Sequence, residues 1–201
     1  MRPIMSFNYW SIPPKGLANW APWVEYSDAF TPEECEQITS IYKADRAAEV
    51  KRKNNDQGLQ LDRRDSKINW IEVNSQSEWI YSRIAYFASE CNTFRYQMKL
   101  DGFTDQIQFT EYAPGQHYNW HLDLGPHPTS GRKLSCVLNL TNPEMYQGGG
   151  TEIMYNKDPE LMSMSQGSLS FFPSYMLHRA LPVKLGYRHT LVAWIGGDHF
   201  V

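Results

Sequence analysis

The sequence predicts an α+β protein in which two helices precede a β-rich half. Two observations lead to this class. Amphipathic patterns with N-terminal capping signals cover residues 31–45 and 77–92, as is typical of helices. After Gly102, short runs of aromatic and β-branched residues alternate with turn signals and no helical period interrupts them. This second half is therefore expected to form an antiparallel sandwich or barrel.

The first 24 residues differ in character from the rest of the chain. They mix prolines with aromatic side chains, which disfavours a helix and suits an extended arm that lies over a domain surface. A short strand is expected over 23–30. The 201 residues are enough for one full hydrophobic core, so residues 25–201 are expected to form a single domain.

The segment 31–45 carries the clearest helix start. Thr31 is the expected N-cap, Pro32 occupies the first helical position, and Glu34 completes a capping box. Cys35 and Ile38 begin the apolar stripe of this helix. The polar stretch 46–67 that follows contains Asn and Gly and is expected to be a flexible loop.

The second helix is expected over 77–92. Ser75 is the expected cap, with Glu78 three residues later. Its apolar face consists of Trp79, Ile80, Ile84, Phe87 and Cys91. The strands that follow are expected over 105–112, 116–123, 133–140, 151–155, 167–172, 176–181 and 187–195.

Composition excludes several classes of partner. A net charge of -3, without a clustered excess of Lys and Arg, gives no electrostatic footprint for nucleic acid or an anionic membrane. No apolar window reaches the length of a membrane-spanning helix, and the N-terminus lacks the apolar core of a signal peptide. The three cysteines are widely spaced and match no disulfide or zinc framework. A cytoplasmic location is therefore expected.

A possible metal site begins in the strand 116–123. Residues two apart on a strand point to the same face, so His121 and Asp123 project together. A pair of this kind is common and is weak evidence alone. His117 lies about 13 Å away along an extended strand, too far to share an ion with His121. His178 lies in a short apolar run, where an unpartnered imidazole is costly, and is the strongest third ligand.

Two histidines and one carboxylate form the facial ligand set of non-haem Fe(II) oxygenases, which leaves positions open for a cosubstrate and O₂. A 2-oxo acid that carries a second carboxylate needs a fixed cation for its far end, and arginine suits this role because its guanidinium binds carboxylates with two parallel hydrogen bonds. Arg188 follows His178 by ten residues and begins the last strand. It is the expected anchor.

Three stretches resemble Fe(II)- and 2-oxoglutarate-dependent dioxygenases of the prolyl 4-hydroxylase-like superfamily, in particular the PKHD-type hydroxylases of bacteria and phages. In order they are YAPGQHYNWHLD, RKLSCVLNLTNPEMYQGGGTEI and GSLSFFPSYMLHRALPVKLGYRHTLVAWI. The segment RDSKINWIE also looks like the N-terminal portion of that family. The resemblance implies a double-stranded β-helix core (jelly-roll, cupin-like) over about residues 104–196, with the two N-terminal helices supporting it.

The resemblance also implies roles for single residues. His121, Asp123 and His178 match the iron ligands by position. Arg188 matches the residue that pairs with the C5 carboxylate of 2-oxoglutarate, and Tyr112 matches a tyrosine that contacts this cosubstrate.

Further residues are expected around the pocket of such an enzyme. Trp194, Tyr118 and Leu134 are expected to form its walls. Arg63 and Arg64, in the polar stretch 46–67, are expected to belong to a substrate loop. GGG at 148–150 is interpreted as a tight turn or bulge before the next strand, although glycines also permit a close substrate contact.

The implied activity is hydroxylation of an unactivated C–H bond, with 2-oxoglutarate and O₂ consumed and succinate and CO₂ released. Ascorbate is a further cofactor to test. Asp123 favours hydroxylation over halogenation, because halogenating relatives lack this carboxylate.

Several substrates and functions stay open at this point. The family name suggests a prolyl residue in a peptide or protein as the substrate, with a free amino acid or another small metabolite as the alternative. A non-catalytic binding module of cupin-like shape is a different class of function, and a metalloenzyme without 2-oxoglutarate would leave Arg188 without a role. The oligomeric state is not readable from the sequence.

Overall fold

A computed structural model describes residues 19–51, 57, 58 and 60–198 of the chain. The helices are α1 (Pro32–Ile41) and α2 (Glu78–Cys91), and a π-helical turn, η1 (Asn92–Tyr96), continues α2. Two short 3-10 turns are η2 (Thr129–Gly131) and η3 (Pro143–Met145). The strands before η2 are β1 (Val24–Tyr26), β2 (Arg46–Ala47), β3 (Val50–Lys51), β4 (Gln57–Gly58), β5 (Arg64–Asp65), β6 (Lys67–Ile71), β7 (Gly102–Phe103), β8 (Ile107–Tyr112) and β9 (His117–His121). The later strands are β10 (Arg132–Asn139), β11 (Gln147–Gly148), β12 (Thr151–Met154), β13 (Glu160–Leu161), β14 (Leu169–Pro173), β15 (Leu177–Ala180), β16 (Val183–Leu185) and β17 (Arg188–Gly196).

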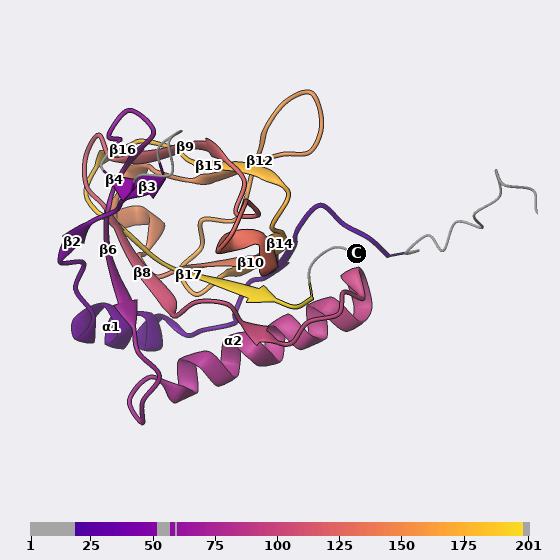
Figure 1. Cartoon of the computed structure of the whole chain (residues 1–201). Helices are drawn as coiled ribbons and strands as arrows, with labels where there is room; N and C mark the ends of the chain where they lie inside the picture. Colours follow the sequence, from indigo (N-terminus) through magenta and orange to yellow (C-terminus); the bar gives the residue numbers. More distant parts are fainter. Residues whose placement is uncertain (1–18, 52–56, 59, 199–201) are drawn as a thin grey trace, which may run out of the picture.

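These strands form two main antiparallel sheets. The major sheet has the order β1-β14-β10-β17-β8-β6-β2, with β7 added beside β17, and the minor sheet has the order β13-β12-β15-β9-β5. In Figure 1, α1 and α2 lie against one face of the major sheet, and the minor sheet lies across its other face. Mostly antiparallel sheets with a few helices are consistent with the jelly-roll fold of the 2-oxoglutarate oxygenases.

Side chains along the central strands point alternately into two interiors, one between the major sheet and the helices and one between the two sheets. On β10, Leu134, Cys136 and Leu138 point to the helices, while Val137 and Asn139 point to the minor sheet. This is the two-residue period of a strand that is covered on both faces. The helix-side interior is the larger hydrophobic cluster, and the opposite interior holds the polar site described below.

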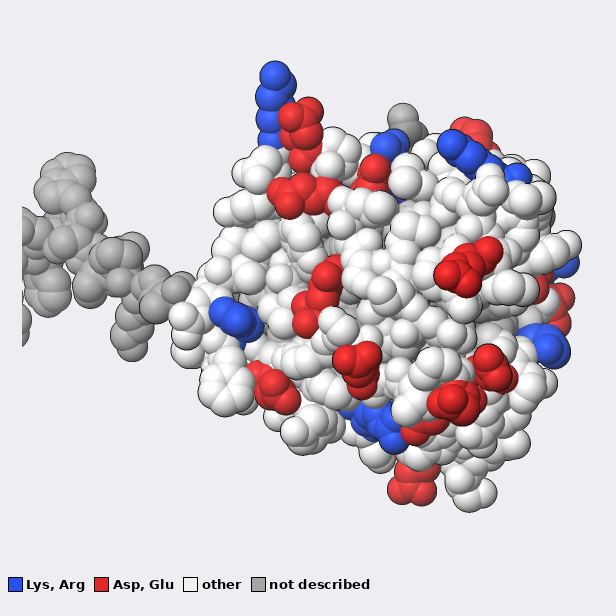
Figure 2. Space-filling model, turned by 180° about the vertical axis from the view of Figure 1, so that it is seen from behind, with Lys and Arg blue, Asp and Glu red and all other residues white. Residues whose placement is uncertain are grey.

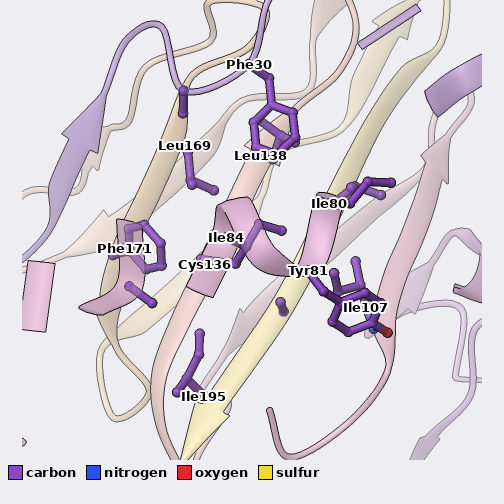
Figure 3. Close-up of a cluster of buried hydrophobic side chains, with 14 of the residues drawn as sticks. Phe30, Ile80, Tyr81, Ile84, Ile107, Cys136, Leu138, Leu169, Phe171 and Ile195 are labelled. Atoms are coloured by element: carbon purple, nitrogen blue, oxygen red, sulfur yellow. The ribbon is translucent and has the colours of Figure 1, made fainter. Parts of the chain in front are cut away.

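The helix-side cluster holds the helices on the sheet. Figure 3 shows Ile84 of α2 beside Cys136 and Leu138 of β10, and Ile80 of α2 belongs to the same cluster. Ile84 and Leu138 are fully buried. Burial of such side chains contributes about 1.5–3 kcal/mol each. The face of the sheet that carries the polar site therefore lies on a rigid base.

The start of α1 is a complete capping box. Thr31 Oγ1 accepts a hydrogen bond from the Glu34 backbone N at 3.2 Å, and Glu34 Oε2 accepts one from the Thr31 backbone N at 2.9 Å. The same carboxylate pairs with Arg83 of α2. The cap thus satisfies two backbone donors and links the two helices.

Replacing Thr31 with Ala is expected to lower the free energy of unfolding by about 1 kcal/mol, the usual effect of losing an N-cap oxygen. Urea unfolding followed by circular dichroism measures this change. Thr31→Ser, which retains the hydroxyl, is the matched control and should stay close to the wild type. An alanine variant as stable as the wild type would show that the cap contributes nothing here.

Three expectations about the N-terminal half were wrong. The helix expected over 31–45 ends at Ile41, and α2 is capped at Ser77 and not at Ser75. The stretch 46–67 is not simply a flexible loop, because it contributes β2, β5 and the start of β6. Strand β6 pairs with β8 along its full length, and β5 pairs with β9. These short polar strands depend on their partners, so local sequence carries little signal for them.

The arm expected over 1–24 falls mostly outside the described residues. Of its described part, Trp20 lies 5.6 Å from the ring centroid of Tyr155, and Trp23 packs against the buried cluster between the sheets. Val24 begins β1, which pairs with β14 at the edge of the major sheet.

The surface offers no strong single-sign patch on the face shown in Figure 2, where acidic and basic side chains are interspersed. None of the described helices is both long and apolar enough to cross a membrane. All three cysteines are unpaired and buried.

Candidate active site

The minor sheet brings three metal-binding side chains together. His121 ends β9 and His178 lies on β15, and the two residues are direct partners in the pairing of these strands. Asp123 follows β9, where its backbone N donates to the Ser174 carbonyl at 3.1 Å. His121 Nε2 lies 3.7 Å from Asp123 Oδ1, and His178 Nε2 lies 3.5 Å from Asp123 Oδ2. One ligand atom from each residue lies within 4.8 Å of the other two.

The hydrogen bonds of both imidazoles assign their tautomers. His121 Nδ1 lies 2.8 Å from the Asn119 carbonyl oxygen, and His178 Nδ1 lies 2.9 Å from the Met176 carbonyl oxygen. Because a carbonyl oxygen only accepts, each Nδ1 carries a proton, so in the neutral ring each Nε2 keeps its lone pair. Both lone pairs belong to the nitrogens that approach Asp123. A backbone partner on the far nitrogen is the usual support of a metal-binding histidine.

The protonation states also suit a metal. Burial lowers the pKa of His121 to about 3, and the neighbouring His178 ring adds to this effect, so His121 is neutral at physiological pH. Burial opposes ionisation of Asp123, but the adjacent His178 and His121 rings outweigh it and hold the pKa of this carboxyl below its ordinary value. His121 therefore presents a neutral imidazole beside the carboxylate of Asp123.

In the described part of the chain, one oxygen of the Asp123 carboxylate receives no hydrogen bond. This atom, Oδ2, is buried and has no hydrogen-bond partner among the described residues. Three electron-pair donors that converge in a buried site repel one another unless a cation lies between them. Two imidazole nitrogens and a carboxylate oxygen are the donor set of an open Fe(II) site, so these residues fit that metal.

Arg188 is a second unusual group in the same pocket. It begins β17, pairs with Tyr112 on β8 and is only 2% exposed. Its Nη2 donates to Asn139 Oδ1 and to Thr151 Oγ1, both at 2.9 Å. Its Nε is buried without a hydrogen-bond partner, and no carboxylate in the described part of the chain pairs with it.

A buried guanidinium without an anion is costly, so this arrangement favours binding of a ligand carboxylate. The pocket that Arg188 shares with His121, Asp123 and His178 lies between the two sheets.

The expected wall residues separate into two groups. Tyr112, Tyr118 and Trp194 line the pocket. The Tyr118 ring stacks on His121, with ring centroids 3.5 Å apart and an interplanar angle of 11°. Leu134 does not line it, because on β10 it points to the helices and is fully buried in that cluster. The expectation for Leu134 was wrong, because this side chain lies on the opposite face of β10 from the pocket. Val137 lies on the pocket face of β10.

Arg63 and Arg64, expected to act together, lie in different environments. Arg64 belongs to β5, is 8% exposed and lines the pocket. Arg63 is exposed, and its side chain is not part of the pocket lining. Arg63 belongs to the turn that precedes β5, whereas Arg64 begins the strand and is held by its pairing with β9.

Sequence reasoning missed the two residues that hold Arg188. Asn139 ends β10 and Thr151 begins β12, directly after the glycine run 148–150. Gly149 has a φ of +70°, and a Cβ there would lie 2.7 Å from Val183 Cγ2 and 3.4 Å from Arg188 Cδ. The glycines thus form a tight turn that lets the chain pass close to Arg188. The glycine run was therefore the sequence signal that could have pointed to the residues around Arg188.

Comparison with known proteins agrees with the site. The sequence model of the 2OG-Fe(II) oxygenase superfamily matches residues 107–196, from β8 to β17. This part of the chain is similar to the 2OG-Fe(II) oxygenases. The superfamily implies Fe(II) and 2-oxoglutarate together with O₂, and His121, Asp123 and His178 are the described side chains that fit the iron.

Curated sequences match part of the chain. A PKHD-type hydroxylase of Prochlorococcus marinus (strain NATL2A) is 40% identical over 90 residues, which are 44% of this chain and 40% of the relative. Another, from strain MIT 9301, is 31% identical over 125 residues, which are 62% of this chain and 54% of the relative. The chain thus spans about half or less of the curated relatives it matches.

Solved structures extend the similarity of fold beyond the oxygenase region. A prolyl-4-hydroxylase of Pseudomonas putida superposes with a TM-score of 0.67 at 18% identity, covering 88% of this chain and 93% of that one. A prolyl hydroxylase from Trichoplax adhaerens, in complex with a peptide fragment of hypoxia inducible factor, gives 0.71 at 16% identity, covering 87% and 83%. At these identities the likeness shows the fold alone.

Proposed function

We propose that this protein is an Fe(II)- and 2-oxoglutarate-dependent dioxygenase that hydroxylates an unactivated C–H bond. One observation carries the proposal: two imidazole lone pairs and a carboxylate converge in the same pocket as a buried guanidinium that has no anionic partner among the described residues. Bound Fe(II), with 2-oxoglutarate and O₂, would supply the oxidising power for hydroxylation, with succinate and CO₂ released.

The residues of the chain would then divide the work. His121, Asp123 and His178 would hold the iron, and Arg188 would bind the C5 carboxylate of 2-oxoglutarate. Asn139 and Thr151 hold Arg188 by its Nη2 atom, which leaves its other donors for the ligand. Tyr112, whose ring centroid lies 5.8 Å from the guanidinium carbon of Arg188, would pack against the cosubstrate.

The walls of the pocket would orient the substrate and restrict water. Trp194 lines the pocket, and the Arg132 guanidinium lies 3.7 Å from its ring centroid, which fixes the indole from behind. We propose that residues 25–201 act as one unit, because β1, β2 and β6 complete the same major sheet that β8, β10, β14 and β17 form. We place this unit in the cytoplasm on the basis of its unpaired cysteines.

A prolyl residue in a peptide or protein is the first substrate to test. Its support is the PKHD-type hydroxylase name of the relatives and the prolyl hydroxylases among the similar structures, one of them solved with a peptide. A free amino acid or another small metabolite is the alternative.

The test is Fe(II)-dependent conversion of 2-oxoglutarate to succinate by the purified chain, with and without ascorbate. Prolyl peptides and free amino acids are added as separate panels. Succinate above a chelator-treated control, raised by one of the panels, is the expected result. No succinate above that control with any panel would contradict the enzymatic function and favour a non-catalytic binding module.

A binding measurement tests the site without knowledge of the substrate. Mn(II) together with N-oxalylglycine, a stable analogue of 2-oxoglutarate, should raise the melting temperature, because ligands that bind only the folded state stabilise it. At about 100 times the dissociation constant the gain is about 2.7 kcal/mol.

A further inference from the structure

A second buried arginine points into the pocket. Arg64 lies on β5, where it pairs with Tyr118 of β9, and its residue is 8% exposed. It lines the same pocket as His121, Asp123 and His178. Arg188 lies in the major sheet, whereas Arg64 lies in the minor sheet, so the two guanidinium groups reach the pocket from different walls.

In the described part of the chain, the groups that contact the Arg64 guanidinium are neutral. Its Nε donates to Ser66 Oγ at 3.0 Å, and its guanidinium carbon lies 4.7 Å from the ring centroid of Tyr118. No described carboxylate lies within ion-pair distance of it. Arginine cannot lose its proton in a protein, so burial leaves a charge that an anion would stabilise.

Other arginines near the pocket differ from Arg64 in this respect. Arg179 also lines the pocket, but its Nε donates to Glu152 Oε2 at 2.7 Å. Arg132, which covers the ring of Trp194, pairs with Asp105 at 2.9 Å. In both cases a carboxylate of the chain already pairs with the guanidinium. Arg64 and Arg188 are the described pocket arginines that lack one.

Arg64 reaches the pocket beside Tyr118. The guanidinium lies over the Tyr118 ring, and this ring stacks on His121 with ring centroids 3.5 Å apart. An anion bound by Arg64 would therefore lie at the Tyr118 side of the pocket, apart from a cosubstrate held on Arg188.

We propose that Arg64 binds a carboxylate of the substrate, so that the substrate of this enzyme carries a carboxylate. The proposal rests on the proposed function. The carboxylate has two possible sources, the α-carboxylate of a free amino acid or the side chain of an acidic residue in a peptide. Both present the planar pair of oxygens that a guanidinium binds with two hydrogen bonds.

The full chain loaded with Mn(II) and N-oxalylglycine tests this, because the analogue occupies the site of Arg188. Acetate and acetamide, which differ in charge but hardly in shape, are the probes. Bound Mn(II) broadens the proton resonance of a methyl group held near it, so broadening measured against concentration gives the affinity. Acetate should bind the wild type more tightly than acetamide does.

The decisive variant is Arg64→Gln. Arg63→Gln is its matched control, because this variant removes an equal charge from the neighbouring residue, which does not line the pocket. Arg64→Gln should weaken acetate binding about tenfold or more, as loss of a charge-assisted pair does, and should leave acetamide unchanged. Arg63→Gln should bind acetate as the wild type does. Arg64→Lys, which keeps the charge without the planar fork, should fall between them.

The two possible sources are compared with further probe pairs. These are L-proline against L-prolinamide, and acetyl-Pro-Asp-amide against acetyl-Pro-Asn-amide. A preference for L-proline supports the α-carboxylate, and a preference for the aspartyl peptide supports an acidic side chain. If the wild type prefers neither acetate nor any carboxylate-bearing partner of a pair, the proposal is overturned.

The outcome for Arg64 is separable from the outcome for the proposed function. If Mn(II) and N-oxalylglycine fail to stabilise the wild type, the proposed function itself fails. If they stabilise both the wild type and Arg64→Gln but the two bind acetate equally, only the role of Arg64 is overturned. Retained stabilisation also shows that Arg64→Gln is folded. If Arg64→Gln does not fold, the role of Arg64 is tested by the preference of the wild type within each probe pair and by the acetate affinity of Arg64→Lys.

Discussion

Replacing Asp123 with Asn is expected to abolish metal binding while leaving the metal-free protein at least as stable as the wild type. The carboxylate faces two imidazole lone pairs and has a buried oxygen without a hydrogen-bond partner among the described residues. An amide has the same shape and can donate to one of these nitrogens, so it relieves the repulsion. It is also a poor ligand for a hard cation. A loss of function combined with unchanged stability is the signature of a binding site.

Two measurements check this expectation. The rise in melting temperature with Mn(II) should disappear in Asp123→Asn, and succinate formation should fall by more than about 100-fold, since loss of a group that only hydrogen-bonds to a metal ligand already costs about 10–100-fold. Asp158→Asn, a change at an exposed acidic residue, is the matched control and should behave as the wild type. An Asp123→Asn protein that still gains stability from Mn(II) would place the metal elsewhere.

Replacing Arg188 with Met should remove binding of the cosubstrate while leaving binding of the metal. The side chain keeps most of its volume but loses the guanidinium that Asn139 and Thr151 hold. Each charge-assisted hydrogen bond contributes about 1.5–3 kcal/mol, and two of them correspond to a rise of about 100-fold or more in the KM for 2-oxoglutarate.

Stabilisation measured in two steps separates the two ligands. Mn(II) alone should raise the melting temperature of Arg188→Met as it does that of the wild type, and N-oxalylglycine should add nothing further. Arg95→Met, at an exposed arginine of η1, is the control for loss of charge and should retain both steps. If N-oxalylglycine still stabilises Arg188→Met, another group binds its far carboxylate.

Local chemistry explains which parts of the fold could be predicted. The start of α1 was readable at Thr31, because a capping box involves residues three positions apart and needs no distant partner. The long strands β8, β10 and β17 also coincide with expected runs, since apolar and β-branched residues dominate them. Strand β5 could not be predicted, because its two residues are ordered by pairing with β9.

The site shows the same division at the level of single residues. The spacing of His121 and Asp123 is local. His178 was indicated by its place in an apolar run and Arg188 by its place at the start of the last strand, and the resemblance to a known family supported both. The face that each side chain occupies was not readable everywhere. Leu134 and Val137 lie three positions apart on β10 and point into different interiors, and only the covering of the sheet by helices on one side decides which interior holds the pocket.

By itself, the sequence predicted the β-rich fold class, the order of the long strands along the chain and the candidate metal-binding and anchoring side chains, because these depend on residue type and on spacing along the chain. The tertiary structure decided that two imidazole lone pairs meet a carboxylate, and that Asn139 and Thr151 hold Arg188. It also decided that Arg64, and not Arg63, enters the pocket. These features depend on strands that pair across the sheets, and the distance between residues on different strands is not written in the spacing along one chain.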